Sequence, residues 1–132
     1  WPYWSALAQE LMYRGTVCIT GLRGEVDVPK GCDAFYGPLL QVGGLIKNSG
    51  MFIGNEGGLS HYAAALETKT YIVYGGTDPV KNLPPCGDVS VISLGIECQP
   101  CQFTAKDPAV GCDDRKCLKQ LRVDEVMRQL WD

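Results

Sequence analysis

The residues with the clearest chemical potential lie in the stretch FIGNEGGLSHYAAAL, Phe52 to Leu66. An acid, Glu56, is followed at once by Gly57 and Gly58, and the chain's only histidine, His61, comes three residues later. Glycines let a ligand approach the backbone closely, and a carboxylate accepts hydrogen bonds from hydroxyl groups. The stretch therefore predicts a site for a ligand that carries hydroxyl groups and fits against bare backbone.

The surrounding pattern places these residues in a strand-to-helix turn. The short apolar run MFIG, Met51 to Gly54, predicts a strand, and LSHYAAALE predicts a helix that begins near Leu59 or Ser60. The N–H groups at the start of a helix, together with its dipole, suit phosphate or pyrophosphate. Because anions repel each other, we expect Glu56 to hold sugar or ribose hydroxyls, and Ser60 and His61 to add a hydroxyl and an imidazole. The turn suits a sugar attached to a phosphate. The alternative is that it is only a tight connection between a strand and a helix.

The elements that must position this turn alternate along the chain. The pattern predicts helices at Trp4–Met12, Leu39–Asn48 and about 123–131, and further strands at Thr16–Thr20, Tyr71–Tyr74 and Val89–Leu94. Strands that alternate with helices form a parallel sheet with helices on both faces. The predicted fold class is therefore α/β, a doubly wound parallel sheet.

Two further segments end at the same predicted edge of the sheet. Glu25 lies in an irregular loop from Gly21 to about Pro38, and Asp78 lies in the Pro-rich loop after the Tyr71–Tyr74 strand. Each acid alone is by default a solvated or turn residue. Ligands of open α/β sheets bind at the carboxyl ends of the strands, so the shared position favours one binding site.

Composition limits the class of protein. The chain has 132 residues, 45% of them hydrophobic and 20% charged. This is enough for one domain, residues 1–132, with a hydrophobic core. A net charge of −3 gives no footprint for nucleic acid or an anionic membrane surface. No apolar run approaches the ~20 residues that cross a bilayer, so we expect at most peripheral membrane contact. The start at Trp1 leads us to expect a piece of a longer protein.

Seven cysteines, an odd number, argue against a complete disulfide framework and favour a reducing cytoplasm. Four of them, Cys98, Cys101, Cys112 and Cys117, lie in an irregular segment, 97–117. Their spacing allows a four-thiolate zinc site, disulfides, or reduced thiols that only pack. A non-catalytic assembly module built on this cluster is the alternative function.

Several stretches together resemble glycosyltransferase family 9, the ADP-heptose:lipopolysaccharide heptosyltransferase family. They are WPYWSALAQEL, LIKNSGMFIGNEGGLSHYAAAL, YIVYGGTDP, CQPC and CLKQLRVDEVM, in the family's order and spacing over essentially the whole chain. The match is to the C-terminal, donor-binding half of those proteins, which are built of two Rossmann-like domains in the GT-B arrangement. It implies a Rossmann-like fold, an N-terminal acceptor domain absent from this chain, and a cytoplasmic location, with the cytoplasmic face of the inner membrane as one option.

The resemblance also implies roles for the residues of the turn. Glu56 resembles the acid that contacts the hydroxyls of the transferred sugar. Gly57, Gly58 and the N–H of Leu59 resemble the cradle of the donor's diphosphate, and His61 resembles the histidine that lines it.

Outside the turn, Glu25 matches the acid that holds the nucleotide ribose, and Thr77 and Asp78 belong to a run similar to the family's Gly-Pro-Thr-x-Pro loop. The chain departs from the family in three ways. A Glu replaces the usual Asp at Glu56, the loop from Gly21 to Asp33 is shorter than usual, and the family's lysine before Trp-Pro would lie upstream of this chain.

The chemistry implied by the family is transfer of a glycosyl group with inversion, from a nucleotide-diphosphate-sugar donor for which ADP-heptose is the first candidate. The general base and the acceptor cleft belong to the family's N-terminal domain. We therefore assign no catalytic residue, cofactor or metal to this chain, and we expect it to bind donor weakly and to catalyse nothing alone.

Overall fold

The computed structural model describes residues 1–102 and 112–131. Its elements, in chain order, are α1 (Trp4–Leu11), β1 (Cys18–Thr20), β2 (Asp33–Phe35), α2 (Leu39–Lys47), β3 (Phe52–Asn55), α3 (Gly58–Ala65), β4 (Thr70–Val73), α4 (Pro79–Asn82), β5 (Val89–Ile92), α5 (Lys116–Lys119) and α6 (Val123–Trp131).

All the strand pairs in the described residues are parallel, which confirms the predicted α/β class. β3, β4 and β5 form one sheet with β4 in the middle, and β1 pairs with β2 in a second sheet. No strand-to-strand ladder joins the two sheets within the described residues. Apolar runs predict strands, but they do not say which strand pairs with which.

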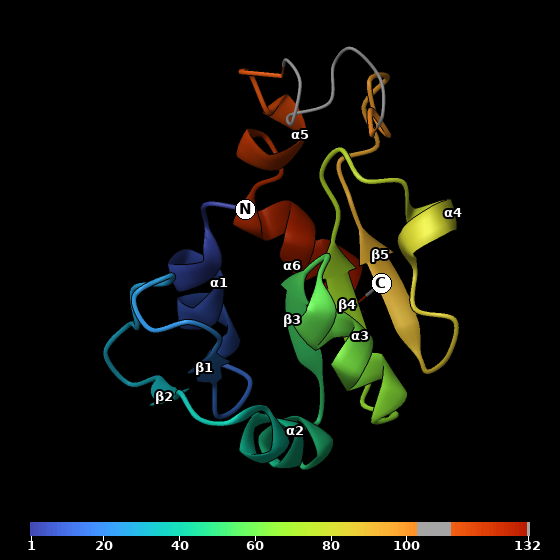
Figure 1. Ribbon diagram of the computed structural model, residues 1–132. Helices are drawn as coiled ribbons and strands as arrows, with labels where there is room; N and C mark the ends of the chain where they lie inside the picture. Colours follow the sequence, from blue (N-terminus) through green and yellow to red (C-terminus); the bar gives the residue numbers. More distant parts are fainter. Residues whose placement is uncertain (103–111, 132) are drawn as a thin grey trace.

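Helices cover both faces of the three-stranded sheet, as predicted (Figure 1). All four residues of β4 are buried. One face packs Tyr71 and Val73 against α1 and α6 through residues such as Leu7 and Val126. The apolar cluster on the α2 and α3 side contains Val42, Ile46 and Ala63, with Phe35, Phe52, Leu59 and Leu66 packed around it. The site-bearing turn between β3 and α3 therefore stands on a sheet that is fixed from both sides.

Small residues bring α2 and α3 close together. Ala63 and Ala64 are fully buried, and their small side chains let α3 lie close against the sheet. A side chain at Gly43 of α2 would overlap the ring of Tyr62 on α3. Gly43 therefore weakens α2 locally but allows the contact between the two helices.

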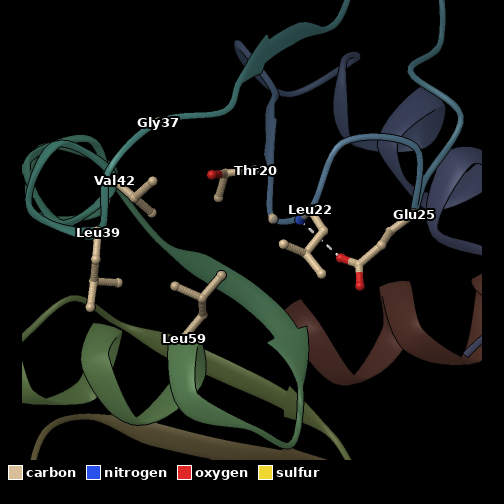
Figure 2. A pocket seen from close by; sticks show the side chains of 8 residues that line it. Thr20, Leu22, Glu25, Gly37, Leu39, Val42 and Leu59 are labelled. Atoms are coloured by element: carbon tan, nitrogen blue, oxygen red, sulfur yellow. Dashed lines mark hydrogen bonds between the residues drawn. The ribbon is translucent and has the colours of Figure 1, made fainter.

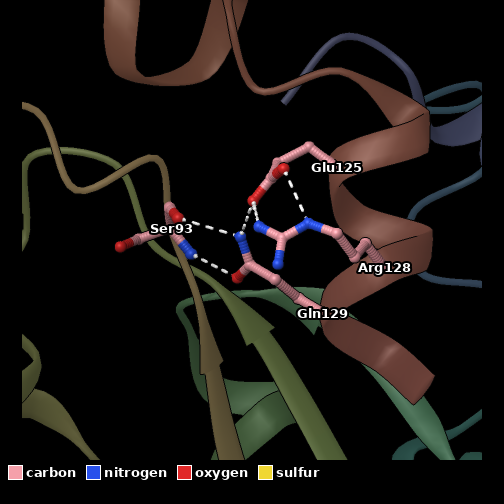
Figure 3. Close-up of polar contacts among 4 residues, drawn as sticks. All are labelled: Ser93, Glu125, Arg128 and Gln129. Carbon is pink, nitrogen blue, oxygen red and sulfur yellow. Dashed lines mark hydrogen bonds and ion pairs between the residues drawn. The ribbon is translucent and has the colours of Figure 1, made fainter. Parts of the chain in front are cut away.

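The amide of Gln129 attaches α6 to the end of β5 (Figure 3). The Ser93 N–H donates to Gln129 Oε1 at 3.3 Å, and Gln129 Nε2 donates to the Ser93 carbonyl at 3.2 Å. The same Nε2 donates to Glu125 Oε1 at 2.6 Å, and Arg128 donates to both oxygens of Glu125. This network fixes α6 on the face of the sheet opposite to α2 and α3.

Three short elements were not predicted. β2 lies in the expected loop; Asp33 and Ala34 are exposed, so it has no apolar pattern. The Asp78–Pro79 pair begins α4, since Asp78 Oδ1 accepts from the Val80 N–H at 3.0 Å and proline suits the first helical position. α5 is a four-residue helix that begins at Lys116, at the end of the expected irregular segment 97–117, and runs two residues beyond it. Residues 103–111 of that segment lie outside the described part.

Candidate ligand-binding site

The N-terminus of α3 offers backbone donors that have no partner. Gly57 precedes the helix and Gly58 is its first residue. Among the described residues, no hydrogen bond is made by the N–H groups of Gly57, Gly58 and Leu59. A Cβ placed on either glycine would meet no atom within 4 Å. The start of α3 therefore has three N–H groups without a partner and open space beside its two glycines, as an anion site requires.

Glu56 stands directly beside these donors. Its N–H donates to the carbonyl of Val73 at 3.2 Å, which extends the β3–β4 pairing by one residue. Its half-buried carboxylate makes no hydrogen bond or ion pair within the described part of the chain. Burial raises the pKa of Tyr74, and the nearby negative charge of Glu56 adds to the rise. The carboxylate is thus held at the carboxyl end of the sheet with its oxygens available to accept hydrogen bonds.

Ser60 and His61 differ in how far they are available to a ligand. Ser60 is 1% exposed, and its hydroxyl donates to the carbonyl of Asn55 at 2.6 Å. That bond fixes the β3–α3 turn. The Ser60 hydroxyl proton is therefore not available to donate to a ligand. The half-buried His61 donates its backbone N–H to Gly57 at 3.2 Å, while its imidazole makes no hydrogen bond within residues 1–102 and 112–131.

A pocket of about 310 Å³ lies next to this helix end (Figure 2). Figure 2 shows Leu22 and Glu25 on one side, Leu39 and Val42 of α2 opposite them, and Leu59 of α3 facing both. The residues that line it are Thr20, Gly21, Leu22, Glu25, Gly37, Leu39, Val42 and Leu59. Leu59 joins the two features, because its side chain lines the pocket and its N–H is one of the free donors.

Glu25 closes one side of the pocket. Its Oε2 accepts from the Leu22 N–H at 3.0 Å, and the Glu25 N–H donates to the Leu22 carbonyl at 3.2 Å. These bonds fold the loop after β1 into a turn that directs the carboxyl group toward the pocket (Figure 2). Oε1 makes no hydrogen bond within the described residues, so it can accept from a ligand.

Thr77 and Asp78 do not line this pocket. Thr77 lines a second pocket of about 200 Å³, together with Tyr74, Gly75, Pro79, Ser93, Gly95, Gln99 and Pro100. Asp78 caps α4, and its Oδ2 lies 3.8 Å from Lys81 Nζ. The structure thus brings Glu25 and Leu59 to one pocket and places Thr77 in another. A ligand contact for Thr77 or Asp78 stays a prediction.

The cysteine cluster shows neither disulfide nor metal geometry. The structure describes all seven cysteines and contains no disulfide among them. Within the described residues, no group of three or more His, Cys, Asp or Glu side chains is arranged to hold a metal ion. Burial raises the pKa of the Cys117 thiol, and neighbouring Cys101, Cys98 and Cys112 add to the rise. The four thiols of the segment are therefore near one another, and zinc binding, disulfides and packing thiols all stay predictions from the spacing.

Thr20 is a site residue that the sequence reasoning missed. It is the last residue of β1 and lines the pocket. Its buried Oγ1 has no hydrogen-bond partner, which is true of no other buried side-chain oxygen or nitrogen in the described residues. A threonine at the carboxyl end of a predicted strand was a usable signal, because ligands bind at that edge.

A sequence model of glycosyltransferase family 9 (heptosyltransferase) matches residues 36–109, more than half of the chain. The solved structure of E. coli ADP-heptose LPS heptosyltransferase II matches with a TM-score of 0.64 and 20% sequence identity over 98% of this chain. The aligned part is 40% of that protein, so the chain spans well under half of its length. No curated protein sequence gives a significant match. No helix in the described residues is long and apolar enough to cross a membrane.

Proposed function

This chain belongs to glycosyltransferase family 9 (heptosyltransferase), and we propose that it is the domain that binds the nucleotide-diphosphate-sugar donor. The solved heptosyltransferase with the similar fold is more than twice as long as this chain. The acceptor and the general base would therefore belong to another domain, and this chain would bind donor without turning it over.

One observation carries the proposal. The free N–H groups of α3 and the pocket meet at Leu59. A nucleotide-sugar has the same sequence of parts: an aromatic base on a ribose, a diphosphate, and a sugar. The pocket volume of about 310 Å³ is at the lower end for ligand sites, which fits the nucleoside part alone. The diphosphate would then lie on the N–H groups of Gly57, Gly58 and Leu59.

The two carboxylates suit the two sugars of such a donor. Glu25 lies at the pocket and has one oxygen available, so it would accept hydrogen bonds from the ribose hydroxyls. Glu56 directly precedes the free N–H groups in the chain, so we place the transferred sugar beside it, beyond the diphosphate. Neither carboxylate suits a phosphate contact, because like charges repel.

The chemistry supported by this arrangement is stabilisation of a leaving group. When the bond between the sugar and the diphosphate breaks, negative charge grows on the nucleoside diphosphate. Free N–H groups fixed at a helix start stabilise that charge without rearranging. An acceptor hydroxyl, deprotonated by a base on the other domain, would attack from the opposite face and invert the anomeric carbon.

We propose ADP-heptose as the donor, and lipopolysaccharide or a related surface glycan as the product to which the whole protein contributes. The support is the family and the fold match to a heptosyltransferase. The corresponding place of work would be the cytoplasm or the cytoplasmic face of the inner membrane, where the domain would meet its acceptor domain and at most the membrane surface.

The proposal is tested by Glu56→Gln, with Glu10→Gln as a control that removes the same charge from an exposed position on α1. Loss of a charged hydrogen-bond acceptor costs about 1.5–3 kcal/mol, so E56Q should weaken ADP-heptose binding at least ~10-fold. Binding of ADP, which lacks the heptose, should not weaken. Calorimetric titration measures both. Equal ADP-heptose affinity in E56Q and E10Q would overturn the role of Glu56.

A further inference from the structure

The pocket beside α3 has apolar walls and few polar groups. Leu22, Leu39, Val42 and Leu59 supply the apolar side chains that line it. Leu22 is 72% exposed and Leu39 is 60% exposed, so two large apolar side chains at this pocket stay in contact with water. Among the lining residues, only Thr20 and Glu25 carry polar side-chain atoms. A flat apolar ring with a polar edge fits these walls better than a phosphate or a sugar.

Thr20 has an unused hydroxyl at this place. Its Oγ1 is buried and has no hydrogen-bond partner. A buried hydroxyl without a partner destabilises the folded chain, and in native structures such a group calls for an explanation. Figure 2 shows Thr20 between Val42 and Leu22, with Leu59 facing them from α3. A change of χ1 by about 120° exchanges the hydroxyl and the methyl group of a threonine between staggered positions. The hydroxyl can therefore turn toward a ligand in the pocket that Thr20 lines.

We propose that the Thr20 hydroxyl recognises the nucleobase of the donor by a hydrogen bond. This inference rests on the proposed function, because it assumes that the ligand is a nucleotide-sugar. The base inserts between Leu22 and the side chains of Leu39 and Leu59 and covers apolar surface that is now exposed. The Thr20 hydroxyl then hydrogen-bonds to an amino, imino or carbonyl group on the edge of the ring, since a hydroxyl both donates and accepts.

Glu25 does not compete for this role. Its Oε2 already accepts from the Leu22 N–H, and its charge suits the ribose hydroxyls rather than the acceptor nitrogens of a base. Thr20 comes from the end of β1, on a strand that pairs with β2 in register Thr20 to Phe35. A residue on a strand is placed more rigidly than a loop residue, as recognition of a ring edge requires.

The test uses Thr20→Val, which keeps the branched shape, and Thr20→Ser, which keeps the hydroxyl. ADP, UDP and GDP are titrated calorimetrically against each variant and the unaltered chain, with inorganic pyrophosphate as a ligand that has no base. T20V should weaken the best-bound nucleotide about fivefold, the value of one neutral hydrogen bond, and leave pyrophosphate unchanged. T20S should restore nucleotide binding to within about twofold. Without ligand, T20V should raise the melting temperature by about 3 °C, because it removes an unsatisfied hydroxyl.

The outcomes separate this inference from the proposed function. Nucleotide binding that is unchanged in T20V would overturn the role of Thr20 and leave the donor site standing. A T20V variant that weakens nucleotide and pyrophosphate equally, or that lowers the melting temperature, would show a structural role and also overturn it. No binding of any nucleotide to the unaltered chain would overturn both.

Discussion

Gly58 and Gly44 are both helical glycines at which an added methyl group would meet open space. They differ only in position, since Gly58 begins α3 beside Glu56 whereas Gly44 lies on the exposed side of α2. If a diphosphate lies on the backbone of Gly58, a methyl group there occupies the space that the ligand needs. Nothing in the folded chain itself requires a glycine at either position.

Gly58→Ala should therefore fold normally and bind ADP-heptose at least ~10-fold more weakly, because it separates the phosphates from the charge-assisted N–H donors. Gly44→Ala is the matched control. It should gain about 1 kcal/mol in free energy of unfolding from helix propensity and keep its affinity. Urea unfolding and calorimetric titration measure the two effects. Full affinity in a folded G58A variant would show that the turn is only a connection.

Single residues also show what the sequence could reveal about the site. The Glu56–Gly57–Gly58 turn could be predicted, because an acid and two glycines follow one another between a strand pattern and a helix pattern. For Thr20 the sequence offered only its place at the carboxyl end of a predicted strand, since most threonines in strands have no ligand. Its unsatisfied hydroxyl appears only when the walls around it are in place.

At the scale of elements, the contact between α2 and α3 sets the shape of the pocket, because Val42 and Leu59 come from these two helices. Neighbouring glycines of α2 make this contact testable. A methyl group at Gly43 would overlap Tyr62, while one at Gly44 would touch nothing.

Gly43→Ala should lower the free energy of unfolding by about 1 kcal/mol, since overpacking of ~1–3 kcal/mol exceeds the ~1 kcal/mol gained from helix propensity. The same substitution one residue later, G44A, should raise the free energy of unfolding. Chemical denaturation of both variants decides the matter. A gain in stability for G43A as large as that for G44A would contradict the close packing of Tyr62.

Elements with an apolar period could be predicted from the sequence, and those without one could not. α1, α2, α3 and α6 have buried apolar positions at helical spacing, and β4 is a continuous buried run. β2 pairs through its backbone while Asp33 and Ala34 are exposed, so its side chains carry no pattern. The Asp78–Pro79 pair is typical of the start of a helix, but α4 has only four residues. That is too short for an apolar period to appear in the sequence.

At the scale of the whole molecule, several thiols share one response to pH. Burial is the first cause that raises the pKa of Cys18, Cys32 and Cys117 above the ordinary value of 9.0. A group whose pKa is higher in the folded state binds its proton more tightly when the chain is folded. Its contribution to stability is complete below the unfolded pKa and is lost as the pH rises through the folded pKa.

The melting temperature should therefore fall above about pH 9. Calorimetric scans across this range measure it. Cys117→Ala should fall less steeply, relative to its own value at pH 7, because it removes one of the three thiols. If the melting temperature instead increased as the pH was raised beyond about 9, the predicted direction of the thiol effect would be contradicted.

The pocket belongs to the whole molecule because no continuous stretch of sequence contains it. Its walls come from the loop after β1, from α2 and from the first turn of α3. The motifs of the sequence predicted the family and the diphosphate turn, since these depend on local order and spacing. The meeting of the pocket with that turn at Leu59 depends on how three separate segments fold together.

The central claim is that a nucleotide-sugar binds across this pocket and the start of α3. The most direct test is an amide NMR titration of the chain with ADP-heptose, run in parallel with UDP-hexose and GDP-hexose. Saturable shifts are expected at Gly57, Gly58 and Leu59, and at Leu22 and Glu25 on the other side of the pocket, and they should be largest with ADP-heptose. A folded chain whose amides at these positions do not move with any donor at millimolar concentration would contradict it.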